Sequence, residues 1–235
     1  LNDRSQFVSI NGESSYSRKL TCGVPQGSVL GPLLYLMYTS PLGDVIRRHD
    51  LSFHMYADDT QMYTAFTCGN EDELVSTRFQ IESCISDIDK WMAVNKLKLN
   101  KDKTELLHLH SRFSSPPQLH SFTFGNDTVY FAAHARNIGV TFDDTFSYEK
   151  QINNLVKSSF FHLRNIAKVR NYLSDDVCKI LIQSLVCSKI DNCNALLYGL
   201  PKHLINKIQS VQNAAARIIA KKRKNDHISP VLQQL

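Results

Sequence analysis

Two adjacent aspartates, Asp58 and Asp59, lie inside the otherwise apolar and aromatic-rich run HMYADDTQMYTAF, which spans residues 54–66. The run is typical of a buried hairpin, and a carboxylate taken out of water costs free energy unless it is paired or bound to a metal ion. No lysine or arginine lies between Arg48 and Arg78. The first question is therefore which positive charge these two carboxylates meet.

The alternation of side chains around the pair predicts a strand that begins near Leu51. Tyr56 and Asp58 fall on its more polar face, and Asp59 then points away from Tyr56. A return strand over 61–66 places both aspartates at a tight turn, where Asp tolerates left-handed backbone better than most residues. Because Asp-Asp is common in turns, the pair alone is weak evidence for a metal site.

Strand and helix signals alternate over the first 147 residues. Strands over 6–10 and 16–20 flank the turn Asn11-Gly12, and a glycine- and proline-rich stretch then leads into an apolar helix with Pro32 in its first turn and Pro41 at its end. A long amphipathic helix over 70–95 has Asn70 and Glu73 as a cap pair. Strands are expected over 104–109, 121–131 and 136–142. This pattern predicts an α+β layer.

After Tyr148 the strand signals stop, and the periodicity predicts three helices. In the first, an apolar stripe lies opposite four cations that fall within about 40° of each other, given 3.6 residues per turn. We call these cations the basic ridge: Lys150, Lys157, Arg164 and Lys168. Ser174 is a suitable N-cap for the second helix, and the third covers 204–218. The segment is therefore expected to be all-helical.

The positive charge is concentrated in this helical segment. Residues 150–226 carry 14 Lys and Arg against 4 Asp and Glu, whereas the remainder carries 13 against 18. A basic segment joined to an acidic one favours a polyanion bound by the first and metal binding or catalysis in the second. The six cysteines include no C-x-x-C pair, so a zinc site has little support. No apolar run approaches the roughly 20 residues that span a bilayer, which favours a soluble protein without membrane contact.

Five stretches resemble the reverse transcriptase of non-LTR (LINE-type) retrotransposons, most closely those of vertebrates. They are CGVPQGSVLGPLLYLMY (22–38), FHMYADDTQMY (53–63), NKLKLNKDKTELL (95–107), RNIGVTFDD (136–144), and LLYGLP followed by VQNAAARII (196–201 and 211–219). They follow the family's order over nearly the whole chain. Two departures are TSPL at 39–42 and Asn192, which stands where a tyrosine is expected before Cys193.

The resemblance implies a two-metal site in which Mg²⁺ or Mn²⁺ ions activate the primer hydroxyl and stabilise the departing pyrophosphate. It makes Asp58 a ligand of these ions and Asp59 its less direct neighbour. Tyr56 is then expected close to the primer terminus. Lys103 is expected near the phosphates of the incoming dNTP, as a candidate proton donor to the pyrophosphate.

The resemblance also implies the contacts with nucleic acid. Pro25, Gln26 and Gly27 match the loop that lies against the template and the incoming nucleotide. The hairpin that grips the primer end corresponds to Ile138, Gly139 and Val140. The basic helices correspond to the thumb, which holds the template–primer duplex through its phosphates, and the basic ridge is the expected contact surface.

Each of these roles has a plain structural alternative. Gln26 and Gly27 are typical of an ordinary turn, and Lys103 is one of several lysines near residue 100. Tyr56 would serve equally as a core aromatic residue. The basic ridge would be the solvated face of any globular helix.

The expected organisation is the C-terminal part of a polymerase palm over 1–147, a helical thumb over 148–225, and the truncated start of a downstream segment over 226–235. The family's other metal-binding aspartate and its fingers are expected upstream of Leu1, so the isolated chain is expected to be inactive. RNA template, DNA primer and dNTPs are the expected partners, and the protein partners are unknown. The expected location is intracellular, in the nucleus for an active element. A non-catalytic nucleic-acid-binding fragment and a retroelement relic without function stay open as alternatives.

Overall fold

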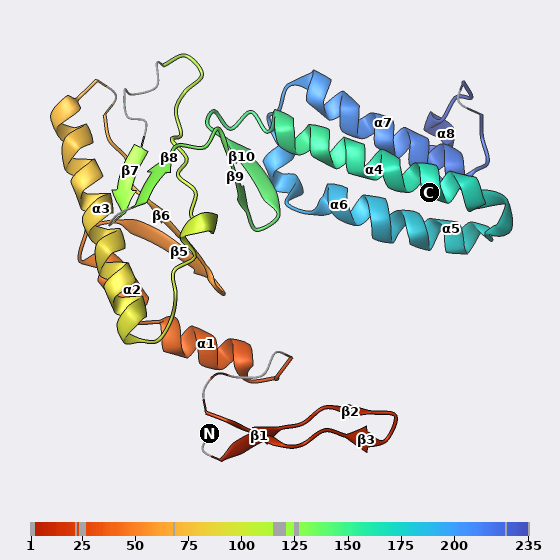
Figure 1. The fold of residues 1–235 in the computed structure, drawn as a ribbon. Helices are drawn as coiled ribbons and strands as arrows, with labels where there is room; N and C mark the ends of the chain where they lie inside the picture. The colour runs from red at the N-terminus through yellow and green to blue at the C-terminus, as the bar shows by residue number, and fades with distance from the viewer. Residues whose placement is uncertain are drawn as a thin grey trace. The chain divides into compact units, whose positions relative to one another are not determined.

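The computed structural model describes residues 3–21, 23, 27–67, 69–114, 121–124, 127–223 and 225–234. The chain divides into two compact units, 1–102 with 122–128 and 103–121 with 129–235, and each is described by itself (Figure 1). Helices and small antiparallel two-stranded sheets make up both units, so the predicted α+β class is confirmed at this level. Among the described residues, no helix is both long enough and apolar enough to cross a membrane.

The first unit opens with the predicted hairpin. Strand β1 (Arg4–Gln6) pairs with β4 (Arg18–Leu20), and β2 (Ser9–Ile10) pairs with β3 (Glu13–Ser14). Asn11 and Gly12 form the turn with φ values of 53° and 88°. Two successive positive φ values are what a two-residue turn needs if it is to match the twist of the strands.

The two helices predicted for the first unit are present, and a short helix that the sequence did not predict lies between them. The apolar helix is α1 (Gly31–Thr39), with proline in its first turn, and Pro41 precedes the short α2 (Leu42–Arg47). Helix α3 (Glu71–Val94) begins at Asn70, whose Oδ1 accepts a hydrogen bond from the Glu73 N–H at 3.2 Å. The Glu73 carboxylate accepts from the N–H of Thr67 at 3.0 Å. The predicted cap pair therefore exists, but its second bond reaches three residues further back.

Between α2 and α3 the chain forms an antiparallel hairpin of β5 (Ser52–Tyr56) and β6 (Asp59–Tyr63). One face of this hairpin packs on the two helices. The core of this unit consists of Leu42, Val45, Ile46, Leu51, Cys84 and Ile88, with Phe53, Met55 and Met62 of the hairpin against it. The other face stays exposed, so the hairpin is half-buried and not buried as the sequence suggested.

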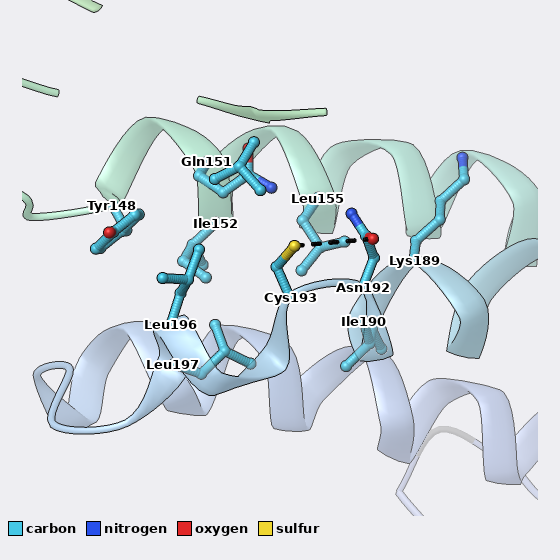
Figure 2. A pocket seen from close by; sticks show the side chains of 11 residues that line it. Tyr148, Gln151, Ile152, Leu155, Lys189, Ile190, Asn192, Cys193, Leu196 and Leu197 are labelled. Atoms are coloured by element: carbon cyan, nitrogen blue, oxygen red, sulfur yellow. Dashed lines mark hydrogen bonds between the residues drawn. The ribbon is translucent and has the colours of Figure 1, made fainter. Parts of the chain in front are cut away.

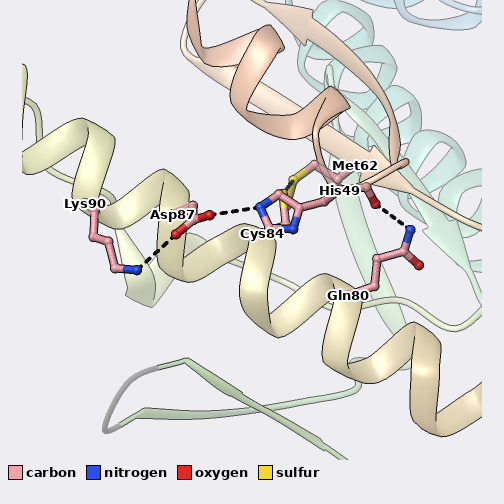
Figure 3. A network of polar contacts seen from close by, with 6 residues as sticks. All are labelled: His49, Met62, Gln80, Cys84, Asp87 and Lys90. Carbon is pink, nitrogen blue, oxygen red and sulfur yellow. Dashed lines mark hydrogen bonds and ion pairs between the residues drawn. The ribbon is translucent and has the colours of Figure 1, made fainter.

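A polar network ties the end of α2 to α3 (Figure 3). His49 Nε2 lies 3.1 Å from Asp87 Oδ2, and Lys90 donates to Asp87 Oδ1 at 3.0 Å. The hydrogen bonds from Lys90 and then His49 lower the pKa of Asp87. Burial, with the charge of Asp87 second, raises the pKa of the Cys84 thiol to about 11. Cys84 is thus a protonated core residue, as expected of a structural cysteine.

The strands that follow α3 are shorter than predicted. Strands β7 (Ser121–Phe124) and β8 (Asp127–Tyr130) form one hairpin, and β9 (His134–Asn137) and β10 (Val140–Asp143) form another. The single strand predicted over 136–142 is therefore wrong, because the turn at Ile138 and Gly139 divides it. The single strand predicted over 121–131 is also wrong, because two shorter strands, β7 and β8, take its place. The strand predicted over 104–109 is also wrong. After a 3-10 helix at Lys101–Lys103, that stretch makes only an isolated bridge from Leu106 to Phe131.

The second unit ends in a bundle of helices. Its long helices are α4 (Glu149–Val169) and α7 (Lys202–Ile219), which pack together. Shorter elements lie between and after them: a 3-10 helix (Arg170–Tyr172), α5 (Asp175–Ile182), a π-helix (Gln183–Cys187), α6 (Ser188–Asp191), a 3-10 helix (Asn194–Leu197) and α8 (Ser229–Leu232). The predicted apolar stripes supply the core, including Ile152, Leu163, Leu204, Ile208 and Val211. Ser174 caps α5, as predicted, by accepting from the Val177 N–H at 3.3 Å.

Arg170 joins three parts of this bundle. Its buried guanidinium donates to the carbonyl oxygens of Ile218 and Ile219 at the end of α7, each at 2.8 Å, and to that of Leu173 at 2.9 Å. It also forms an ion pair with Asp175 at the start of α5. The cation therefore satisfies terminal carbonyl groups of α7 that lack partners within their own helix.

Candidate active site and nucleic-acid interface

Asp58 and Asp59 lie at the tip of the β5–β6 hairpin. Tyr56 pairs with Asp59, which leaves a two-residue loop of Ala57 and Asp58, and Ala57 has a φ of 53°. Both aspartates are exposed, so they stay in water and the burial cost that motivated the first question does not arise. Within the described part of the chain neither carboxylate forms a hydrogen bond or ion pair. Both are free to bind an added cation.

The prediction that Asp59 points away from Tyr56 is wrong. Residues paired directly across an antiparallel ladder project from the same face, and Tyr56 and Asp59 are such a pair. The Tyr56 side chain is 63% exposed, which excludes its alternative role as a core aromatic residue. The ring and the Asp59 carboxylate therefore present a joint surface on the open face of the hairpin.

The same open face continues down the hairpin. His54 pairs with Gln61, and Ser52 pairs with Tyr63. The rings of His54 and Tyr63 stack with centroids 5.5 Å apart, and the Tyr63 hydroxyl lies 3.1 Å from His54 Nε2. Polar and aromatic groups thus cover the face opposite the core, behind the acidic tip.

Tyr35 of α1 is a neighbour of the acidic tip that the sequence did not reveal. Its pKa is raised, first by burial and second by the negative charge of Asp58. A phenol whose ionisation is opposed in this way stays protonated and can donate a hydrogen bond. Only the tertiary packing of α1 near the hairpin brings this residue to Asp58, since 23 positions separate them in the sequence.

The two carboxylates fit Mg²⁺ as part of a donor set. Carboxylate oxygen is the ligand type that this ion prefers, and a pair of ions is held by carboxylates from more than one strand. Among the described residues, no group of three or more His, Cys, Asp and Glu side chains is placed to hold a metal ion. In the described part of the chain, the hairpin tip therefore supplies two candidate ligands and no third.

The other residues predicted to contact nucleotide are not brought together by a described contact. Pro25 and Gln26 lie outside the described residues. Gly27 has a φ of 81°, a conformation that L side chains rarely adopt. Lys103 is exposed at the end of the 3-10 helix and belongs to the second unit, whereas Asp58 belongs to the first. Its predicted role stays a prediction.

Ile138 and Gly139 form the turn of the β9–β10 hairpin. Their φ values are 44° and 82°, and positive φ at a β-branched residue is an outlier that signals strain. Ile138 is 47% exposed, while Val140 is buried. A Cβ on Gly139 would lie 3.9 Å from the Asn192 side chain, so the residue at the family's tyrosine position lies beside this turn. The hairpin thus presents a strained apolar tip.

Two side chains fix this hairpin to α4. Gln151 of α4 accepts a hydrogen bond from the Thr141 N–H at 2.9 Å. Asp143 is buried and accepts from the N–H groups of Ser147 and Tyr148, each at 2.7 Å, and from Thr145 N and Oγ1 at 3.2 and 3.1 Å. Burial alone would raise the pKa of Asp143, but these hydrogen bonds lower it overall. The hairpin and the helix therefore form one supported element.

A small cavity of about 20 Å³ lies where β10 and α4 meet the loop after α6 (Figure 2). Val140, Leu155, Ile190 and Leu196 contribute apolar walls, and Asn192 and Cys193 enter from the loop. A space of this size holds about one water molecule. It is a packing defect beneath the hairpin and not a nucleotide site.

All four members of the basic ridge are exposed on α4. The buried residues Ile152, Ser159, Leu163 and Ile166 lie on the opposite side of the same helix. The predicted geometry of the ridge is therefore present, and its contact with phosphates stays a prediction.

Comparison with known proteins identifies the family. A family model described as "Reverse transcriptase (RNA-dependent DNA polymerase)" matches residues 3–142. The RNA-directed DNA polymerase from mobile element jockey of Drosophila melanogaster is 25% identical over 230 residues, which is 94% of this chain and 24% of that protein. The probable RNA-directed DNA polymerases from transposon BS and transposon X-element of the same organism are 25% and 24% identical, over 93% of this chain and 24% of each relative.

The chain thus spans about a quarter of the length of these curated relatives. No solved structure matches it. The family model covers more than half of the chain and includes both aspartates of the β5–β6 tip. The chain belongs to the reverse transcriptase (RNA-dependent DNA polymerase) family.

Proposed function

We propose that residues 1–147 are the C-terminal part of the palm, and residues 148–225 the thumb, of an RNA-directed DNA polymerase from a non-LTR (LINE-type) retrotransposon of the vertebrate type, with the start of a downstream segment at 226–235. The observation that carries the proposal is the exposed Asp58–Asp59 pair at the hairpin tip, inside the region that matches the reverse transcriptase model. The jockey, BS and X-element polymerases support the retrotransposon assignment. The vertebrate type and the palm and thumb boundaries stay predictions.

In the proposed reaction a complete enzyme extends a DNA primer on an RNA template with dNTPs, in the nucleus. Bound Mg²⁺ or Mn²⁺ would activate the primer hydroxyl and stabilise the departing pyrophosphate. Asp58 and Asp59 would hold part of the ion pair, and Tyr56 would support the primer terminus beside them. Because the core side of the hairpin is packed on α2 and α3, the carboxylates would be held in position before substrate binds.

The second unit would hold the template–primer duplex. The β9–β10 tip would contact the primer, and the basic ridge would contact backbone phosphates. Gln151 and Asp143 join the β9–β10 hairpin to α4, so both contacts would move together. A non-catalytic nucleic-acid-binding protein would need these surfaces but not the acidic tip.

The test is primer extension by a complete reverse transcriptase that contains residues 1–235. Asp58→Asn keeps the size of the side chain but removes the negative charge that holds the cations. Extension should fall by orders of magnitude while the folded protein and its duplex affinity are retained. Near-normal extension by Asp58→Asn would reject the catalytic assignment and favour the non-catalytic alternative.

A further inference from the structure

A cluster of three polar side chains lies on the flank of α4, outside the basic ridge. Lys189 of α6 donates to Ser158 Oγ at 2.7 Å and contacts His162 Nε2 at 2.9 Å. Ser158 and His162 are one turn apart on α4, and all three residues are half-buried. Figure 2 shows Lys189 extending from α6 toward α4.

The protonation of the cluster follows from its hydrogen bonds. An ammonium group has only donors, so the Lys189 contact requires His162 Nε2 to be the acceptor and therefore places the imidazole proton on Nδ1. The Ser158 oxygen likewise accepts from Lys189, which directs its own O–H elsewhere. Lys189 therefore keeps one N–H donor beyond these two contacts, and the cluster has no negatively charged acceptor.

In the part of the chain that the structure describes, the ammonium group of Lys189 contacts no carboxylate. Lys207 offers a contrast on the other side of α4. It donates to Asn153 Oδ1 at 2.8 Å and lies 4.0 Å from the Glu149 carboxylate. Both lysines brace α4 through a polar side chain, but only Lys207 has an acid beside it.

The position of the cluster relates it to the ridge. Ser158 follows Lys157 directly, which places it about 100° around the helix from the ridge. Phe161, which is 55% exposed, lies on α4 between the basic ridge and the cluster. Its ring packs edge to face against that of His162, with centroids 5.4 Å apart. An exposed aromatic ring next to basic groups is typical of a surface that binds nucleic acid.

We propose that Lys189, held in place by Ser158 and His162, binds one backbone phosphate of a nucleic acid, as a site separate from the basic ridge. A phosphate supplies several acceptor oxygens and the negative charge that the cluster lacks. Because Lys189 is already held by two hydrogen bonds, it loses less side-chain entropy on binding than a free surface lysine would. This site rests on the proposed function only in taking nucleic acid as the partner.

The test is the salt dependence of binding between the 235-residue protein and a short fluorescein-labelled RNA–DNA hybrid, followed by fluorescence anisotropy. Lys189→Met should reduce the slope of log K against log salt by about 1, because one phosphate contact is lost. Ser158→Asp gives Lys189 an internal negative partner and should reduce the slope as much. Lys207→Met is the matched control, and its slope should equal that of the wild type.

Two further variants separate the possible failures. Lys189→Arg keeps the charge and should keep the slope, and thermal unfolding checks that each variant is folded. If replacement of the four ridge residues by alanine lowers the slope while Lys189→Met and Ser158→Asp leave it unchanged, the phosphate site is rejected and nucleic-acid binding by α4 stands. If none of these variants changes the slope, both the site and the proposed duplex contact are rejected.

Discussion

Tyr56 and Asp59 are paired directly across the β5–β6 hairpin, with the ring and the carboxylate on the same open face. The sequence pattern, continued past Tyr56 as a strand, instead predicts that Asp58 shares a face with Tyr56. The alternation fails because Ala57 and Asp58 form the loop, and Ala57 adopts a left-handed φ of 53°. The alternation of side chains between the two faces does not continue through a two-residue turn. The first residue of the return strand is instead paired with the last residue of the outgoing strand, and their side chains lie on the same face.

This pairing changes the expected effect of Asp59→Asn in a complete enzyme. The sequence made Asp59 the less important carboxylate, whereas its position opposite Tyr56 predicts a loss of primer extension as large as that of Asp58→Asn, about 100-fold or more. Steady-state extension at several Mg²⁺ concentrations measures both. Asp44→Asn, which alters an exposed aspartate paired with Arg47 at 2.5 Å, is the control. Extension by Asp59→Asn within about threefold of wild type would contradict the prediction.

The basic ridge predicts a specific response to salt. If its four side chains contact phosphates, each replacement of a ridge lysine by alanine should lessen the salt slope by about 1 and weaken binding equally for all sequences. The measurement is duplex affinity at several salt concentrations and for unrelated sequences. Lys90→Ala removes a cation that is paired with Asp87 on α3 and should leave the slope unchanged. Equal slopes for the wild type and the fourfold variant would make the ridge an ordinary solvated face.

Ile138 predicts opposite effects on stability and function. Replacement by asparagine gives the β9–β10 turn the sequence Asn-Gly, which suits two positive φ values, and relief of the strained isoleucine should stabilise the protein by about 1 kcal/mol. The same change removes the apolar tip proposed to contact the primer, so a complete enzyme should bind primer less tightly. Urea unfolding and primer affinity measure the two effects. Ile138→Val keeps a β-branched residue at the turn and should give no stabilisation. If Ile138→Asn stabilises the protein but leaves primer affinity unchanged, the tip has no binding role.

Asp143 predicts a loss of stability in acid. Its folded pKa is lowered overall, because the hydrogen bonds from 145–148 outweigh the effect of burial. Stability from a lowered pKa is fully present above the ordinary carboxyl range and is lost as pH falls through the folded value. Asp143→Asn should therefore cost about 3 kcal/mol at neutral pH, where an ionised acceptor is lost, and much less near pH 2. Urea unfolding at several pH values tests this, with the half-exposed Asp144→Asn as control. An equal cost at every pH would contradict it.

The sequence predicted the features that depend on local periodicity and capping. The β5–β6 hairpin, the start of α3 at Asn70 and the apolar stripe of α4 are examples, because each is set by neighbours within a few residues. The predictions of the strands after α3 were wrong because strand propensity was outweighed by a turn. Ile138 favours a strand by its propensity, yet the turn at Gly139 determines its conformation. A propensity is a weak constraint when the next residue requires a turn.

Contacts between distant elements were not predictable from one sequence. Burial and, second, the negative charge of Asp58 raise the pKa of Tyr35. Asp143 accepts hydrogen bonds from the backbone just before α4, and Arg170 donates to carbonyl groups at the end of α7. Lys189 of α6 donates a hydrogen bond to Ser158 of α4. Each residue type is common in loops and helices, and the function of each depends on which element the fold places beside it. A buried arginine with several carbonyl partners has no signature in the local sequence.

The last prediction concerns the 235-residue chain by itself. A two-metal site needs carboxylates from more than one strand, and in the described residues the hairpin tip supplies only Asp58 and Asp59. Two of the other acids are committed elsewhere, since Asp44 is paired with Arg47 and Asp143 accepts four hydrogen bonds. The purified chain should therefore bind nucleic acid weakly at low salt but incorporate no dNTP on a primed RNA template with Mg²⁺ or Mn²⁺. Template-dependent extension that Asp58→Asn abolishes would contradict this and show that another acid of this chain completes the site.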